Sequence, residues 1–197
     1  LDSIENAVNA DRELHGQEDD VSGLDVARFG DDDSALVRRQ GNHAKVEWVI
    51  NGNNTMALAG KSALYLRQNQ RTKLFIDITG GLGAGVYDRL KEQPDVSSRV
   101  FGVNVAGQPR DSGTYLNIRV ESWANVRDWL RDAVLDKHEG WYQLANPKYK
   151  ITSVGKLQLE GKEDMKKRGV KSPDVADALA LTLSKPTEGD NLGLIWL

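Results

Sequence analysis

The segment Ser172–Leu181 places two carboxylates at the start of an apolar helix, and no other feature of the chain constrains its fold as strongly. Ser172 is a favoured N-cap residue and Pro173 a favoured first helical residue, so we expect the helix to begin here. A buried stripe at helical spacing follows, made of Val175, Ala178, Leu179, Thr182 and Leu183. Asp174 and Asp177 lie beside it. The helix dipole favours an acid in the first turn and explains Asp174, whereas for Asp177 a functional and a structural reason both remain open.

Composition limits the possible functions. The chain has 197 residues and 39% hydrophobic content, which fits one domain with a single core. It has no cysteine, and its three histidines (His15, His43 and His138) form no ligand pair, so a metal would need oxygen ligands, which suit magnesium, manganese or calcium. No apolar run has transmembrane length and no signal-peptide profile is present, so we expect a soluble, intracellular protein. The net charge of −3 limits any nucleic-acid contact to local basic patches.

The order of the expected elements predicts a mixed sheet. Residues 1–20 are polar and are expected to be a linker or lead-in segment. Three antiparallel strands are expected at 21–27, 34–39 and 45–50, followed by a helix at 55–69 and a strand at 73–78. A glycine-rich turn, a helix around 86–90, a strand at 99–105, a helix at 121–137 and a short strand at 155–159 come next. This order predicts one α/β body over 21–185, with a five-stranded mixed sheet and helices on both faces, and a C-terminal tail over 186–197.

Two further acids stand where apolar strands end. Asp25 follows Gly23-Leu24, on the opposite face of its strand from Leu24, and Asp77 follows Phe75-Ile76. Each alone is also explained as an acid that caps the turn after a strand. If the two strands are neighbours, their backbones lie about 4.8 Å apart, which is close enough for both carboxylates to share a cation. If Asp177 joins them, the three acids would repel one another unless a cation held them together.

Three segments of the chain resemble one known family. They are Gly23–Ala27 followed by Gly30-Asp31-Asp32, then Phe75–Asp77 followed by the glycine-rich turn and Val86–Leu90, and finally Ser172–Leu179. In order and spacing they are similar to the C-terminal nuclease domain of the large terminase subunit of tailed bacteriophages, a member of the RNase H-like fold. The resemblance covers about residues 20–185.

The resemblance implies a function and a set of site residues. Asp25, Asp77 and Asp177 would be the catalytic acids and, with Asp174 as a fourth candidate, would bind two magnesium or manganese ions that hydrolyse phosphodiester bonds. Which acid of the last helix is the main ligand stays open. The substrate would be double-stranded concatemeric viral DNA in the host cytoplasm. The implied partners are a packaging ATPase domain upstream in the same polypeptide, the portal and the small terminase subunit.

DNA contact is expected in the basic C-terminal third of the chain. The candidate phosphate-binding residues are Lys148, Lys150, Lys162, Lys166, Lys167 and Arg168. Each lysine alone is also explained as a solvated surface group. Asp31, Asp32 and Asp33 are expected to form a hydrated turn, and Trp123 and Trp129 to belong to the core. The run Thr55–Ser62 ends like a phosphate loop, but it lacks the first glycine and lies inside a helical pattern, so we interpret it as a coincidence.

Three other functions share features with this sequence. A sugar-kinase-like or actin-like phosphotransferase needs two domains and small hydroxyl residues where Val26–Phe29 stand. A catalytically silent RNase H-like domain that binds DNA or the portal is harder to exclude, although the presence of all three acids counts against it. A Holliday-junction resolvase is possible within the same fold.

Overall fold

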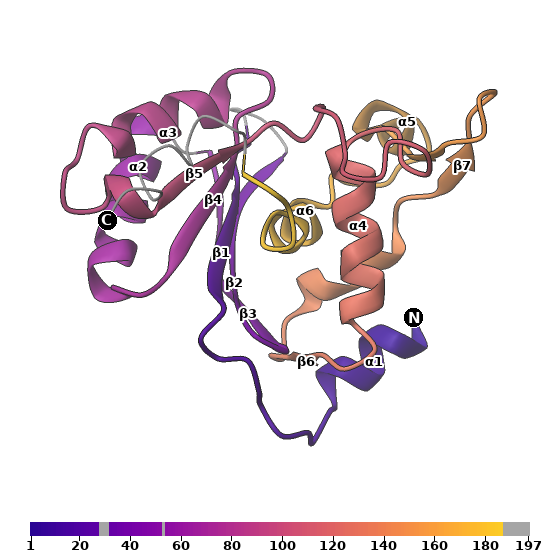
Figure 1. Cartoon of the computed structure of the whole chain (residues 1–197), viewed down its shortest axis with the longest axis horizontal. Coiled ribbons are helices and arrows are strands. Elements are labelled where there is room, and N and C mark those ends of the chain that lie inside the picture. The colour runs from indigo at the N-terminus through magenta and orange to yellow at the C-terminus, as the bar shows by residue number, and fades with distance from the viewer. Residues whose placement is uncertain (28–31, 53, 187–197) are drawn as a thin grey trace.

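A six-stranded mixed sheet forms the centre of the computed structural model, which describes residues 1–27, 32–52 and 54–186 (Figure 1). Its strands are β1 (Asp20–Asp25), β2 (Asp33–Gln40), β3 (His43–Asn51), β4 (Lys73–Asp77), β5 (Val100–Val103) and β6 (Val134–Leu135). They lie in the order β5-β4-β1-β2-β3-β6, with β1, β2 and β3 antiparallel and β4 and β5 parallel to β1. The predicted mixed sheet is therefore confirmed.

The sixth strand was not predicted. Residues 134 and 135 were expected to end a helix over 121–137, but the helix α4 covers Ile118–Trp129 instead. Val134 and Leu135 pair in parallel with His43 and Ala44 at the edge of the sheet. The expected helix was wrong at this end because an open strand edge offers backbone hydrogen bonds that helical periodicity does not reveal.

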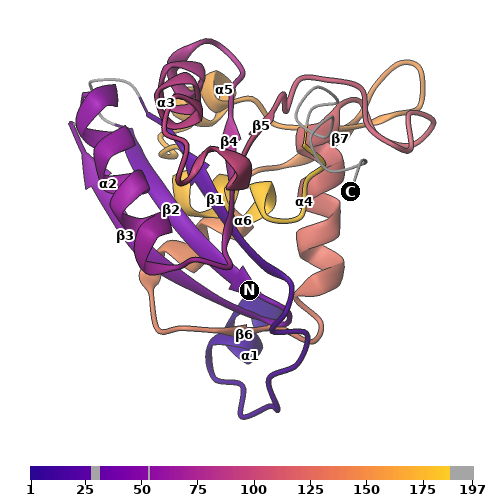
Figure 2. The same ribbon diagram turned by 60° about the vertical axis from the view of Figure 1, so that its left-hand side comes forward.

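Helices cover both faces of the sheet, as Figures 1 and 2 show. One face carries α2 (Thr55–Gln68) and α3 (Leu82–Lys91), and the other carries α4 and α6 (Asp174–Leu181). Smaller elements complete the fold: α1 (Asp2–Val8), η1 (Ser97–Arg99), η2 (Glu139–Ala145), α5 (Lys162–Lys167), and a hairpin of β7 (Tyr149–Ile151) and β8 (Leu157–Leu159). None of the helices in the described ranges is both long and apolar enough to cross a membrane.

Alternation along the strands divides the core into two layers. Leu24 and Leu36 pack with the residues of α2 and α3, whereas Ala35 and Val37 pack with those of α4 and α6. The same alternation directs Asp25 away from Leu24, toward the α6 side. The face of β1 that carries Asp25 is therefore the face on which α6 packs.

Two glycines allow unusually close packing beside the ends of β1 and β4. A Cβ atom added to Gly23 of β1 would lie 1.9 Å from the carbonyl oxygen of Ala178 in α6. A Cβ added to Gly83 of α3 would lie 1.8 Å from the carbonyl oxygen of Asp77. Because no side chain separates these backbones, α6 lies directly against β1 and α3 begins directly against the end of β4.

The start of α6 differs from the sequence-based expectation. The helix begins at Asp174 with Pro173 in the N-cap position, and the Ser172 hydroxyl has no hydrogen-bond partner among the described residues. The predicted Ser172 cap is therefore wrong. Instead, the Gln143 side-chain oxygen accepts a hydrogen bond of 2.8 Å from the Val175 N–H, so a residue of η2 caps the helix.

The expected lead-in segment is packed onto the body. Ile4 and Ala7 of α1 are buried in the core, and the Arg12 guanidinium donates to the carbonyl oxygens of Arg131 and Ala133. The predicted boundaries at residues 20 and 186 stay predictions. Residues 28–31 of the expected turn, with Asp31, and residues 187–197 of the expected tail lie outside the described part of the chain.

Candidate active site

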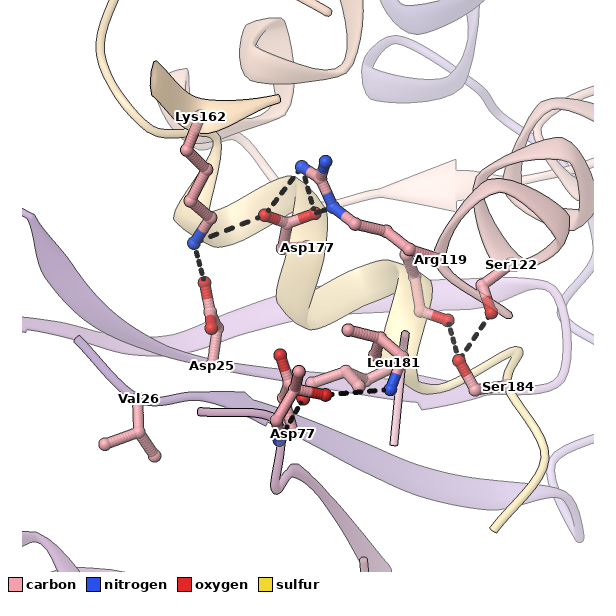
Figure 3. Close-up of a pocket in the computed structure, with 12 residues that line it drawn as sticks. Asp25, Val26, Asp77, Arg119, Ser122, Lys162, Asp177, Leu181 and Ser184 are labelled. Atoms are coloured by element: carbon pink, nitrogen blue, oxygen red, sulfur yellow. Dashed lines mark hydrogen bonds and ion pairs between the residues drawn. The ribbon is translucent and has the colours of Figure 1, made fainter. Parts of the chain in front are cut away.

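Two strand-end acids lie side by side at one edge of the sheet. β1 and β4 are parallel neighbours, and Leu24 lies opposite Ile76. The next residues of the two strands, Asp25 and Asp77, therefore lie beside each other. The first turn of α6 supplies Asp174 and Asp177 from above the same edge. A cavity of about 320 Å³ is lined by Asp25, Asp77 and Asp177 (Figure 3). The structure thus brings all four candidate acids to one place.

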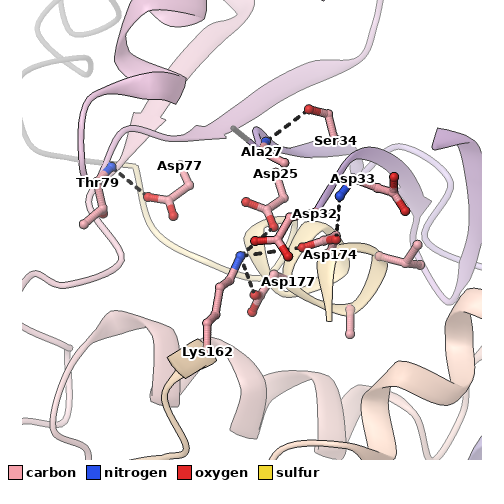
Figure 4. A network of polar contacts seen from close by, with 12 residues as sticks. Asp25, Ala27, Asp32, Asp33, Ser34, Asp77, Thr79, Lys162, Asp174 and Asp177 are labelled. Atoms are coloured by element: carbon pink, nitrogen blue, oxygen red, sulfur yellow. Dashed lines mark hydrogen bonds and ion pairs between the residues drawn. The ribbon is translucent and has the colours of Figure 1, made fainter. Parts of the chain in front are cut away.

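Lys162, at the start of α5, inserts its ammonium group among three of these acids (Figure 4). Its Nζ atom lies 3.2 Å from Asp25 Oδ2, 3.5 Å from Asp177 Oδ2 and 3.7 Å from Asp174 Oδ1. The three carboxylates are mostly buried, with side-chain exposures of 8%, 11% and 7%, while the lysine is 40% exposed. Lys162 was expected to bind DNA phosphates, but here it serves as a counter-ion for the acids.

The acids carry more negative charge than Lys162 neutralises. Burial raises the pKa of Asp25 to about 7, with Lys162 lowering it and the other three acids raising it. Burial also raises the pKa of Asp77 and of Asp174. For Lys162, burial lowers the pKa, but the attraction of Asp25, Asp177 and Asp174 raises it above its usual value. The site therefore favours the entry of further positive charge.

The two acids of α6 have different partners. Asp177 receives the Arg119 Nε and Nη2 donors at 3.1 Å each and the Trp123 indole N–H at 2.9 Å. Asp174 accepts one hydrogen bond of 3.0 Å, from the Asp33 backbone N–H to Oδ2, and its buried Oδ1 has no hydrogen-bond partner among the described residues. Most of the lone pairs of Asp177 are thus already used, whereas Asp174 keeps one oxygen available beside Lys162.

One oxygen of the Asp77 carboxylate, Oδ1, accepts a hydrogen bond from the turn that follows β4. The Thr79 backbone N–H donates to Asp77 Oδ1 at 2.8 Å, and the Thr79 hydroxyl donates to Asn104 Oδ1 at 3.2 Å. In Figure 4, Asp77 lies on the other side of Asp25 from Asp174. Asp25 is therefore the central acid of the group.

The donor set suits a hard divalent cation. In the described ranges, no three carboxylate or imidazole groups are close enough to ligate an ion as they stand. The available ligands are nevertheless all carboxylate oxygens, which magnesium and manganese prefer. Asp174 Oδ1, which accepts no hydrogen bond from a described residue, lies 3.7 Å from the ammonium group. Withdrawal of the Lys162 side chain would leave Asp25 and Asp174 to face the same space.

Most of the expected phosphate-binding residues are paired with acids. Lys166 lies 3.2 Å from Asp32, Lys167 lies 2.9 Å from Asp164, and Arg168 lies 2.7 Å from Glu160. Lys148 and Lys150 are exposed and form no ion pair with a described residue. The expected hydrated turn is also more engaged than predicted, because Asp32 binds Lys166 and the Asp33 backbone binds Asp174.

Arg119 was not identified from the sequence. It joins three segments, because its Nη1 also donates to the Glu160 carbonyl oxygen just before α5. Trp123 is buried in the core as expected, yet its indole N–H also binds Asp177. No local pattern marks either role, since both contacts depend on how α4 packs against α6.

Comparison with known proteins relates the fold to one group of structures. No protein-family model matches the chain, and no curated protein matches it. Among solved structures, the nuclease domain of the large terminase subunit gp2 of bacterial virus Sf6 has a TM-score of 0.72 at 20% identity, over 94% of this chain and 97% of that one. A point mutant of that domain with manganese and β-thujaplicinol has a TM-score of 0.75 at 18% identity, over 94% and 97%.

A second phage gives the same result. The large terminase nuclease from thermophilic phage G20c with bound magnesium has a TM-score of 0.59 at 14% identity, over 92% of this chain and 94% of that one. All three identities are low, so the similarity concerns the fold. The chain therefore has the RNase H-like fold of the phage large terminase nuclease domains.

Proposed function

We propose that this chain is the nuclease domain of a terminase large subunit of a tailed bacteriophage. It would hydrolyse phosphodiester bonds of double-stranded concatemeric DNA. The observation that carries the proposal is the gathering of Asp25, Asp77, Asp174 and Asp177 at the carboxyl ends of β1 and β4. The related folds with bound manganese and magnesium support it.

Asp25, Asp77 and Asp174 are the ligands that we propose for two magnesium or manganese ions. Asp25 lies between the other two and suits a shared position, and Asp174 offers an oxygen that accepts no hydrogen bond and has only the Lys162 ammonium group as an ion-pair partner among the described residues. The ions would activate a water molecule and stabilise the leaving oxygen of the phosphodiester. Asp177, which sequence reasoning placed among the catalytic acids, would instead hold Arg119 and add negative charge close to the ligands.

Lys162 has two roles in this proposal. Without metal, its ammonium group compensates the buried carboxylates. If cations bound, electrostatic repulsion would push the ammonium group away from the acids and toward the solvent, to which the Lys162 side chain is already partly exposed. A lysine displaced to the rim of the cavity would then be available to contact a DNA phosphate.

The proposed context is a larger packaging assembly. The chain would act with a packaging ATPase domain upstream in the same polypeptide, with the portal and with the small terminase subunit, in the host cytoplasm. One observation favours the alternative of a catalytically silent domain that binds DNA or the portal: Lys162 occupies the space between the acids. Metal binding separates the two functions, because a silent domain has no need of it.

A plasmid assay tests the proposal. Purified protein with manganese or magnesium and no ATP should convert supercoiled plasmid to nicked and linear forms with little sequence preference. Asp25→Asn, at the centre of the acids, should remove this activity while the protein stays folded. Intact plasmid with both metals across a range of salt, together with no heat of manganese binding in calorimetry, would favour the silent domain.

A further inference from the structure

The tip of the β7–β8 hairpin exposes two aliphatic side chains. Ile151 and Val154 are 76% and 74% exposed, more than any other large hydrophobic residue in the described ranges. Hydrogen bonds fix the turn that follows Ile151 and contains Val154: Thr152 N–H donates to the Lys156 carbonyl at 2.8 Å, and Gly155 N–H donates to the Thr152 carbonyl at 2.9 Å. The exposed pair is thus presented on an ordered turn.

The base of the hairpin is fastened to the body, and its tip is not. Leu157 N–H donates to the Thr114 carbonyl at 2.8 Å, Leu116 N–H donates to the Leu157 carbonyl at 3.0 Å, and Leu159 is buried in the core. All three residues of β7 are exposed. Figure 1 shows the hairpin projecting from the edge of the molecule near α5. The tip is therefore held at a defined position in solvent.

The hairpin is basic in a chain of negative net charge. Residues 147–159 contain Lys148, Lys150 and Lys156 and no acid, while the whole chain carries −3. Lys148 and Lys150 are exposed. Duplex DNA has charged phosphates outside and stacked apolar base faces inside, so it suits a protrusion that carries both lysines and aliphatic side chains. Proteins that bind the DNA minor groove insert such aliphatic side chains between base steps.

The tip is close enough to the acids to contact the same duplex. Val154 precedes Lys162 by eight positions, and eight residues span at most about 29 Å. One turn of DNA is about 34 Å long. A duplex whose backbone reaches the acids would therefore have a minor-groove segment within reach of the tip.

We propose that the β7–β8 hairpin is a minor-groove wedge, with Ile151 and Val154 inserted between base steps of the DNA whose backbone enters the acid site. Lys148, Lys150 and Lys156 neutralise the flanking phosphates. The inference rests on the proposed function for the identity of its ligand. Insertion of this kind unstacks bases and bends the duplex, so bending is its signature.

The test compares two matched double variants of the full chain. Ile151→Ser with Val154→Ser removes the wedge, and Met56→Ser with Leu64→Ser, two α2 residues that are 57% and 59% exposed, serves as the control. Bending of a duplex of about 30 base pairs is measured by fluorescence energy transfer between labels on its two ends. The buffer contains a chelator so that the DNA is not cut, and affinity is measured over a range of salt concentrations. The wedge variant should bind about tenfold more weakly, with the salt slope unchanged and the bend lost.

A second variant tests the charges. Lys150→Ala with Lys156→Ala should reduce the salt slope by about two and preserve most of the bend. Wild-type bending by the serine wedge variant, or equal losses in the α2 control, would overturn the proposal. If either of these results is found and the wild-type protein still cuts plasmid, only the wedge proposal fails. If the wild-type protein bends DNA through the hairpin and no metal supports cleavage, the wedge stands and the nuclease function fails.

Discussion

Replacing the two acids of α6 by asparagine, one at a time, should separate metal binding from structural support. Asp177 forms a largely buried pair with Arg119, with side-chain exposures of 11% and 18%. Breaking a buried ion pair from one side costs about 3 kcal/mol. In a domain of this size, that free energy corresponds to a fall of about 6 to 12 °C in Tm. Asp177→Asn should therefore lower the Tm of the metal-free protein by this amount.

Asp174→Asn should behave in the opposite way. Burial raises the pKa of Asp174, so its ionised form destabilises the metal-free fold, and a neutral amide relieves that cost. An amide oxygen can still accept the Asp33 N–H. The metal-free Tm should stay within about 2 °C of wild type. Manganese at a hundredfold excess over Kd should stabilise the wild-type protein by about 2.7 kcal/mol and so raise its Tm. In Asp174→Asn this rise in Tm should disappear together with cleavage.

Thermal unfolding with and without manganese measures both effects, with calorimetric titration as a second readout. Asp95→Asn is the matched control, because Asp95 binds Arg67 through two hydrogen bonds at a site where the side chains are 46% and 51% exposed. Solvent screens such an exposed pair, so its loss should change the Tm much less than the loss of the Asp177–Arg119 pair. If Asp177→Asn keeps the wild-type Tm but loses the manganese-induced rise, Asp177 is the third ligand and our reasoning is refuted.

Four further substitutions have defined outcomes. Lys162→Met should lower the metal-free Tm and tighten manganese binding about tenfold in calorimetry, since no ammonium group must leave the acids; unchanged affinity would contradict its role as counter-ion. Gly23→Ala should cost about 2 kcal/mol or more in chemical unfolding, because its Cβ would lie 1.9 Å from a helix carbonyl oxygen. Gly60→Ala, with no atom within 4 Å, should instead stabilise α2 slightly. The Arg168 hydrogen bond lowers the pKa of Glu160 from 4.5 to about 2, so the stability that Glu160 contributes is present above pH 4.5 and lost as the pH falls toward 2. Glu160→Gln should flatten the acid limb of the stability profile in that window, and an unaltered limb would show that the pair contributes nothing.

Local patterns in the sequence were sufficient for five of the six strands of the sheet and for the acids at its edge. Asp25 and Asp77 interrupt apolar strands, and strand alternation fixes the face to which Asp25 points. The apolar spacing after Pro173 predicted a buried helix, and seven of the eight residues of α6 are buried. Such features depend on neighbours within a few residues, which is the range that sequence patterns report.

Contacts across long separations were not predictable in the same way. Lys162 lies 137 positions from Asp25 and looked like one member of a basic run. The partners of Asp177 on α4 are 54 and 58 positions away. The Ser172 cap was predicted from local preference and is wrong, because the side chain of Gln143, 32 positions from Val175, takes its place. In each case tertiary packing decides which polar group meets which.

The close contact between Gly23 and α6 also has a consequence for the order of folding. β1 is a central strand, yet the helix that covers it comes from residues 174–181, and the Asp33–Asp174 hydrogen bond spans 141 positions. During synthesis on a ribosome, the apolar face of β1 and β2 must wait for most of the chain before it is covered. Non-local closure of this kind slows folding and leaves strands available to aggregate meanwhile. The same delay keeps the acids apart until α6 docks, so a partly made chain lacks the arrangement of acids that we propose for metal binding.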